Sequence, residues 1–140
     1  MEIMTDLDIE TAFEVQLSAT AQTIPIDVAY PNVVYVPRQG RPFIKPILFP
    51  GRQSSVGIGT DTRNRHLGVY QIGIWQPSSE TKGPIQTVVN ALKSVFKRGT
   101  VLELGELKVR VLRFRLEAFV EDSDWVTQFV RIEYRADLEN

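Results

Sequence analysis

The chain of 140 residues contains no cysteine and only one histidine, His66. Without cysteine it can form neither a disulfide nor a thiolate metal site, which suits a reducing compartment such as the cytoplasm. A Ser-His-Asp or Cys-His catalytic arrangement needs a histidine base, and no Gly-x-Ser-x-Gly motif accompanies the single histidine. We therefore expect a protein that acts by contact rather than as an enzyme, with no cofactor and no metal.

The chain also lacks a long apolar run. No stretch approaches the roughly 20 apolar residues that a membrane-spanning helix requires, and the acidic first six residues lack the basic start of a secretory signal. The length, the hydrophobic share of 43% and the charged share of 24% are those of an ordinary globular domain. We therefore predict a single domain over residues 1–140, with no membrane among its partners.

Net charge is low, at −1, but its distribution along the chain is uneven. The first 20 residues contain no Lys or Arg, and their acids are Glu2, Asp6, Asp8, Glu10 and Glu14. Between residues 38 and 65, Asp61 is the only acid, and the basic residues are Arg38, Arg41, Lys45, Arg52, Arg63 and Arg65. Opposite fields at two places on one domain favour head-to-tail association with a second copy. Two separately solvated surfaces explain the same pattern equally well.

Two segments have the apolar period of a helix. In Asp6–Ala21, Ile9, Phe13 and Leu17 recur every fourth residue, and Pro25 prevents further continuation. In Ile85–Phe96 one apolar stripe follows a helical period, and its members are Ile85, Val88, Val89, Leu92, Val95 and Phe96. Pro84 suits the first turn of this second helix, and Gly99 suits its C-cap.

Extended segments account for most of the remaining chain. The predicted strands are Ile26–Tyr30, Val33–Val36, Phe43–Phe49, Leu67–Gln76, Val101–Leu104, Leu107–Phe119 and Trp125–Ala136. Pro42, Pro46 and Pro50 cannot donate to a ladder, so Phe43–Phe49 is predicted to be an edge strand or to contain a bulge. Apolar residues on both faces of Leu67–Gln76 indicate an inner strand.

A change of phase marks the strand Leu107–Phe119. Its apolar residues have one parity up to Val111 and the opposite parity from Leu112. One extra residue at Val111-Leu112 would restore a single apolar face, which predicts a β-bulge there.

The elements together predict an α+β fold, with a mixed, mainly antiparallel β-sheet and two α-helices packed on one face. Between the third and fourth predicted strands, residues from about 50 to 65 are rich in Gly, Ser, Thr, Asn and Arg. We interpret this segment as a long flexible loop, because loops of this length are commonly functional or disordered.

Basic residues recur on the two late strands. They are Lys108, Arg110, Arg113, Arg115, Arg131 and Arg135. A basic sheet face is one pattern of nucleic-acid recognition, but the isoelectric point near 5.9 and the lack of aromatic residues among these positions favour cross-strand ion pairs. Acids at Glu121, Asp122 and Asp124 have no EF-hand spacing and are interpreted as a solvated hairpin tip.

Several short motifs, taken in their order along the chain, resemble a known family. They are Ala29-Tyr30-Pro31-Asn32-Val33, Pro42-Phe43-Ile44, His66-Leu67-Gly68-Val69-Tyr70-Gln71-Ile72, Gly83-Pro84 and Val95-Phe96-Lys97-Arg98-Gly99. With them the chain resembles the tail terminator proteins of long-tailed bacteriophages, in particular the lambda-type minor tail protein U family, over roughly residues 5 to 136.

The resemblance implies a structural virion protein. It implies an α+β protomer that closes into a homo-hexameric ring, caps the tail tube, stops tube polymerisation and forms the head–tail joining surface. The implied partners are further copies of the chain, the major tail tube protein, a head completion or connector protein and the tape measure protein. DNA would pass through the ring without specific binding. The implied location is the phage tail, after assembly in the bacterial host cytoplasm.

Charged residues are the candidates for contacts between subunits or with the tail tube. They are Asp6, Asp8, Glu10, Glu14, Arg38, Arg41, Arg52, Asp61, Arg63, Arg65 and His66. We expect the first-helix acids to meet Arg38, Arg41 or the 50–65 segment of a neighbouring copy. The alternatives are another neck or tail-completion protein, a small nucleic-acid-binding module that uses the late basic strands, and a small hydrolase built around His66.

Overall fold

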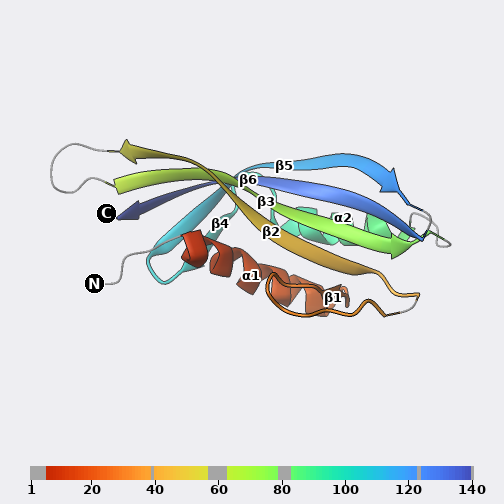
Figure 1. Cartoon of the computed structure of the whole chain (residues 1–140). Coiled ribbons are helices and arrows are strands. Elements are labelled where there is room, and N and C mark those ends of the chain that lie inside the picture. The colour runs from red at the N-terminus through yellow and green to blue at the C-terminus, as the bar shows by residue number, and fades with distance from the viewer. Residues whose placement is uncertain (1–5, 39, 57–62, 79–82, 123, 140) are drawn as a thin grey trace.

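A computed structural model of the chain describes residues 6–38, 40–56, 63–78, 83–122 and 124–139. Within these residues the elements, in chain order, are α1 (Asp6–Thr23), β1 (Asp27–Val28), β2 (Phe43–Val56), β3 (Arg63–Pro77), α2 (Gly83–Val95), β4 (Val101–Leu104), β5 (Leu107–Glu121) and β6 (Trp125–Glu139) (Figure 1). The strands form one sheet with the order β1-β2-β3-β6-β5-β4. Only the short β1–β2 pair is parallel among these described strands. The predicted α+β class is confirmed at the level of two helices and one mixed six-stranded sheet.

Helix α1 forms where its apolar period predicted. Ile9, Phe13 and Leu17 are fully buried on one side of the helix, and Asp6 and Asp8 occupy its first turn. Acidic side chains in a first turn stabilise the positive end of the helix dipole. The helix continues two residues beyond the predicted end, to Thr23.

Helix α2 buries the stripe that the sequence predicted, and a strand side chain caps its start. The Ile85 N–H donates to Oε1 of Gln76 over 3.1 Å, and Gln76 is buried at the end of β3. The first turn of a helix leaves backbone N–H groups without helical partners, so this bond both satisfies one of them and ties α2 to the sheet.

The core is centred on aromatic rings from separate elements. Phe13 of α1 stacks on Tyr70 of β3 at 4.3 Å between ring centroids, and it meets Tyr134 of β6 at 5.5 Å and Phe96 at 6.0 Å. Aliphatic residues from both helices and from one face of β3, β5 and β6 complete the same cluster. Residues at alternate positions of β3 and β6 therefore point toward the helices.

The opposite face of the sheet has its own aromatic cluster at one end. Phe43 stacks on Trp75 at 5.4 Å, Trp125 meets Phe43 edge-on at 5.4 Å, and Phe129 meets Trp75 edge-on at 5.6 Å. A Cβ at Gly73 would clash with the Trp75 ring. The sequence predicted β3 as an inner strand, and the structure confirms it, because β3 lies between β2 and β6.

Four of the strands, β2, β3, β5 and β6, are much longer than the helices. Fourteen or fifteen residues of strand span about 45–50 Å at the usual rise per residue, whereas the 18 residues of α1 span about 27 Å. The end of β2, the start of β3 and the end of β6 consequently project beyond the first turn of α1 (Figure 1). We call this projection, residues 50–56, 63–67 and 135–139, the arm.

The arm corrects the predicted loop at about residues 50–65. Strand β2 continues to Val56 and β3 begins at Arg63, and the two pair in register from Gln53↔His66 to Val56↔Arg63. Residues 57–62 lie outside the described part of the chain. The Gly- and Ser-rich composition suggested a loop, but pairing along β3, with β6 on the far side of it, makes the segment a strand.

Three other strand predictions have mixed outcomes. Val33–Val36 is not a strand, and Ile26–Tyr30 contributes only the two residues of β1. The predicted β-bulge is confirmed, since the register of β5 against β6 shifts between Val111 and Arg113.

Two buried tyrosine hydroxyls make the stability of the fold depend on pH in the alkaline range. Burial, with repulsion from Asp6, raises the pKa of Tyr134 from 10.0 to about 12, and burial, with repulsion from Glu14, raises the pKa of Tyr70 further. Below pH of about 10 the phenols are neutral in both states, so this contribution to stability is complete. As the pH rises from about 10 to 12, the unfolded chain loses protons that the folded chain keeps, and stability falls.

We expect the urea midpoint to fall between pH of about 8.5 and about 11, and to fall less in Tyr70→Phe. Urea unfolding at both pH values measures this difference. An equal fall in Tyr70→Phe and in the unaltered chain would contradict the assignment, because the variant lacks only the titrating hydroxyl.

Candidate assembly interfaces

The acidic residues that the sequence singled out lie along α1. Asp6, at the start of the helix, is 3.2 Å from Nδ1 of His66, which is largely buried in β3. Two of the predicted interface residues are thus partners within one chain, where they hold the first turn of α1 against the arm. Burial raises the pKa of Glu14, and the neighbouring Glu10 carboxyl raises it further through a hydrogen bond and repulsion. Asp8 lies between Asp6 and Glu10 on the same helix.

Arg38 has an acidic partner close by in the sequence. Its Nε lies 3.3 Å from Asp27 Oδ2, and the Tyr35 hydroxyl donates to the same oxygen over 3.1 Å. Burial and the hydrogen bond to Asp27 raise the pKa of Tyr35. Tyr35 also packs on Phe43 with 5.1 Å between ring centroids. The segment from residue 33 to 38 has no regular structure but is anchored by these contacts.

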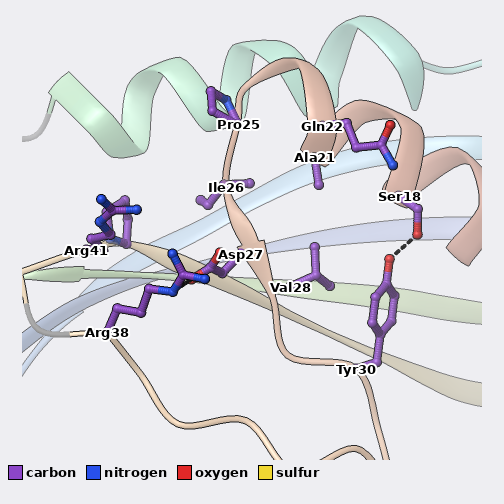
Figure 2. Close-up of a pocket in the computed structure, with 11 residues that line it drawn as sticks. Ser18, Ala21, Gln22, Pro25, Ile26, Asp27, Val28, Tyr30, Arg38 and Arg41 are labelled. Atoms are coloured by element: carbon purple, nitrogen blue, oxygen red, sulfur yellow. Dashed lines mark hydrogen bonds and ion pairs between the residues drawn. The ribbon is translucent and has the colours of Figure 1, made fainter.

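A pocket of about 660 Å³ lies between the last turn of α1 and the chain around β1. Figure 2 shows Asp27 and Arg38 meeting on one side of it and Ser18 bonded to the Tyr30 hydroxyl on the other. Arg41 is exposed at its margin. Asp27 and Arg38 neutralise one another, so Arg41 gives the pocket its one excess charge among the residues that line it.

Three of the remaining predicted residues, Arg52, Arg63 and Arg65, belong to the arm. Arg65 binds Asp137 through two bonds, of 2.9 Å from Nε and 3.3 Å from Nη2. Arg52 is exposed in β2. The Arg63 side chain and the whole of Asp61 lie outside the described part of the chain.

The predicted interface residues therefore do not form one site. They fall into three places, namely the helix α1, the surroundings of β1 and the arm, and the described contacts of Asp6, Arg38, Arg65 and His66 are within one chain. Asp27 and Asp137, which bind two of the arginines, were missed by the sequence analysis. Asp27 lies in the sequence between the acidic and the basic cluster and belongs to neither. Asp137 is 72 residues from Arg65, so no local pattern connects the two.

Both lateral edges of the sheet are largely uncovered in the described part of the chain. Strand β1 pairs with only Phe43 and Ile44 of β2, and β4 pairs with β5 only from Leu107 to Arg110. We call β2 with the segment before it the β1–β2 edge, and β5 with the turn after it the β5–β6 edge. Beyond the short partner strands, β2 and β5 each have a free side.

Prolines limit what can pair with β2. The Ile44 carbonyl accepts a bond from the Ala29 N–H, so residue 44 directs its backbone groups outward. Backbone direction alternates along an antiparallel strand, which gives Pro46 and Pro50 the same outward direction. Because neither proline has an N–H, a continuous ladder cannot form there. The prediction of an edge strand with protective prolines is confirmed for β2 beyond Ile44.

The basic residues of the late strands share the sheet face that the helices leave open. Arg113 lies 3.8 Å from Glu133, and Arg131 lies 3.9 Å from Glu117, as the predicted ion pairs require. The register also places Arg110 opposite Arg135, and Arg115 opposite Arg131. Like charges directly opposite each other on a sheet repel. Binding of an anionic partner at these two arginine pairs would reduce that repulsion.

The described part of the chain shows neither a metal site nor a helix that could span a membrane. Among the described residues, no group of three or more His, Cys, Asp or Glu side chains could hold a metal ion. The described helices are also too short or too polar to cross a membrane.

Comparison with known proteins identifies the family. A family model described as "Phage tail terminator protein" matches residues 8–134, whereas no curated protein matches the chain. A solved structure that has only a sequence identifier as its title aligns over 98% of this chain and 97% of its own, with a TM-score of 0.73 and 23% identity. At that identity the likeness supports the fold alone.

A second solved structure is a chain from "Virion of native gene transfer agent (GTA) particle". It has a TM-score of 0.49 and 20% identity over 86% of this chain and 84% of its own, which is too distant to support an argument. The match of the family model covers nearly the whole chain and describes a structural, non-enzymatic component of the virion tail. The chain belongs to the family of phage tail terminator proteins.

Proposed function

We propose that the chain forms a homo-hexameric ring that caps the phage tail tube, stops tube polymerisation and presents the surface to which the head joins. Its partners are further copies of itself, the major tail tube protein, a head completion or connector protein and the tape measure protein. DNA passes through the ring without specific binding, and assembly takes place in the bacterial host cytoplasm. Within the family we place the chain with the lambda-type minor tail protein U group.

The observation that carries this proposal is the match of the tail terminator family over residues 8–134. Two features of the fold support the ring. Both lateral edges of the sheet have free strands, and the two edges differ in sequence, so contacts between copies are heterologous and close into a ring when the rotation permits. The arm projects beyond the helices, where it can reach another ring or a neighbouring subunit (Figure 1).

Four of the candidate interface residues form ion pairs within the chain, and Glu10 and Glu14 interact with each other. Asp6, His66, Arg38 and Arg65 shape the chain itself through ion pairs. We propose Arg41 and Arg52, together with Asp8, Glu10 and Glu14 of α1, as residues that contact a neighbouring subunit or the tube. Asp61 and Arg63 are proposed to contact the tube.

The mass of the assembly and the length of tail tubes test the proposal together. Light scattering over a concentration series, at low and moderate salt, is expected to reach six times the mass of the 15.9 kDa chain. Purified chain added to tubes of the major tail tube protein is expected to stop their lengthening. Tubes that lengthen at an unchanged rate in the presence of a sixfold excess of chain would contradict the proposed function.

The alternative of a nucleic-acid-binding module is favoured by one observation, the opposed arginine pairs on the open sheet face. The same experiments separate it from the ring. A chain that stays monomeric, leaves tubes unchanged and binds DNA with an affinity that falls steeply as salt rises would support the binding module. A chain that assembles on tubes and binds DNA weakly would support the terminator.

A further inference from the structure

We propose that the subunits of the ring meet edge to edge, with the β1–β2 edge of one copy against the β5–β6 edge of the next. The contact unites exposed valines and basic residues on the first edge with exposed apolar residues and acids on the second. This inference rests on the proposed ring and adds to it the two surfaces that touch. It differs from the expectation that the acids of α1 meet Arg38 and Arg41.

The two edges have opposite charge at one end of the sheet. Beside β1 and the start of β2 are exposed basic residues, namely Arg38, Arg41 and Lys45. At the other side of the sheet, the end of β5 and the turn after it have exposed acids, namely Glu121, Asp122 and Asp124. Opposite charges on two patches steer the association of two molecules and fix their orientation.

The register places the residues next to these two groups of charges at the same height of the sheet. Asp27 pairs with Phe43, Phe43 with Trp75, Trp75 with Thr127, and Thr127 with Val120. One row of neighbouring residues therefore runs from Asp27, which binds Arg38, to Val120, which precedes Glu121. Five strands at the usual spacing make this row about 19 Å wide.

Equal height matters because a closed ring is generated by rotation alone. A rotation about the ring axis moves one copy onto the next without a shift along the axis. A feature on one lateral edge thus meets the feature at the same height on the opposite edge of its neighbour. The basic and acidic groups satisfy this condition, whereas the acids of α1 belong to the helix layer rather than to either lateral edge.

Apolar side chains accompany the charges on both edges. Val34 and Val36 are 93% and 77% exposed, and Leu116 and Val120 are 50% and 54% exposed. Tyr35, between the two valines, is held by Phe43 and Asp27. The valines are therefore presented by an anchored segment, so binding would need little further ordering of the chain. Apolar groups gathered beside complementary charge are typical of a protein interface.

The contact is made by side chains rather than by a shared strand ladder. Pro46 and Pro50 remove donors from the free side of β2, while the free side of β5 from Leu112 to Glu121 contains no proline. A neighbouring β5 could therefore bond only intermittently to β2. Such an edge admits a partner of matching charge and apolar shape and discourages unlimited strand pairing.

Cysteine cross-linking tests the contact directly, because the chain has no cysteine of its own. Val36→Cys and Val120→Cys are prepared separately and mixed under the conditions in which the unaltered chain forms its ring. A short bis-maleimide linker is expected to give cross-linked dimers in the mixture, and none with either variant alone. Leu7→Cys, at a site 70% exposed on α1, is the matched control and is expected to cross-link with neither variant.

Charge reversal supplies a second readout. Arg41→Glu and Glu121→Arg are each expected to raise the concentration needed for half-maximal assembly by about tenfold, since attraction at each contact becomes repulsion. A chain with both changes restores opposite charges at each contact and is expected to recover most of the loss. Circular dichroism confirms that each exposed substitution leaves the fold unchanged.

The outcomes separate this inference from the proposed function. A sixfold mass with no cross-link in the mixture, or with dimers of either variant alone, would overturn the edge-to-edge contact and leave the ring intact. No multimer at any concentration, in solution or on tubes, would overturn the ring and this contact with it.

Discussion

Replacing Phe13 by alanine is expected to lower the free energy of unfolding by about 3–5 kcal/mol, the usual range for removing a buried phenylalanine ring. The ring is fully buried, and it stacks on Tyr70 at 4.3 Å while touching Tyr134 and Phe96. These partners belong to β3, to β6 and to the residue that follows α2. One side chain thus joins both helices to the middle of the sheet, and its loss would leave a cavity in a close-packed core.

Urea unfolding followed by the fluorescence of Trp75 and Trp125 measures this loss. Leu7→Ala is the matched control, because Leu7 lies on the same helix and is mostly exposed. Its expected effect is within about 0.5 kcal/mol. If Phe13→Ala cost no more than Leu7→Ala, the placement of α1 against β3 and β6 would be wrong.

The sequence predicted the elements whose signals are local. The apolar periods of α1 and α2 depend only on residues within each helix, so both were predicted within a few residues of their ends. The bulge in β5 was predicted for the same reason, since the change of parity at Val111-Leu112 is contained in the strand itself. Because side chains alternate regularly between the two faces of a strand, a break in that alternation can be recognised without knowing the partner strand.

The arm could not be predicted from its own residues. Residues 51–56 have the glycine and serine content of a loop, yet they form a strand because β3 supplies a continuous ladder and is in turn supported by β6. Propensity for strands is weak compared with pairing and burial. Residues 33–36 show the converse case. Val33, Val34 and Val36 favour a strand by propensity, but the segment is not paired with any described strand and has no regular structure.

The candidate interfaces were only partly visible in the sequence, because charge was read along the chain and not across the sheet. The linear pattern set the acids of α1 against the basic residues near β2, and it treated Glu121, Asp122 and Asp124 as a solvated tip. The strand register instead places Glu121, which those two aspartates follow, one residue beyond the row that ends on the opposite edge at Asp27, the partner of Arg38. Pairing through four strands is non-local information that spacing alone does not contain.

A second large effect is expected at Gly68, where β3 passes close to both β2 and Tyr134 of β6. A Cβ at this position would lie 2.5 Å from the Tyr134 hydroxyl oxygen and 2.8 Å from the Phe49 carbonyl oxygen. Both distances are shorter than a carbon–oxygen contact permits, and the carbonyl belongs to the backbone of β2. Gly68→Ala is therefore expected to cost about 1–3 kcal/mol of unfolding free energy through forced shifts of β2 and Tyr134.

A double-mutant cycle identifies the cause of that loss. Tyr134→Leu removes both the hydroxyl and the ring carbon that also lies 2.8 Å from the added Cβ, although it creates a cavity of its own. Gly68→Ala is expected to cost less in the Tyr134→Leu background than in the unaltered chain, with a coupling of about 0.5–3 kcal/mol between the two sites. Additive costs would show that Tyr134 does not restrict this glycine, and would leave the Phe49 carbonyl as the obstacle. The same hydroxyl is one of the two that keep their protons to high pH, so the close approach at Gly68 and part of the alkaline loss of stability have one structural origin, the Tyr134 phenol that β6 directs against Phe13 of α1.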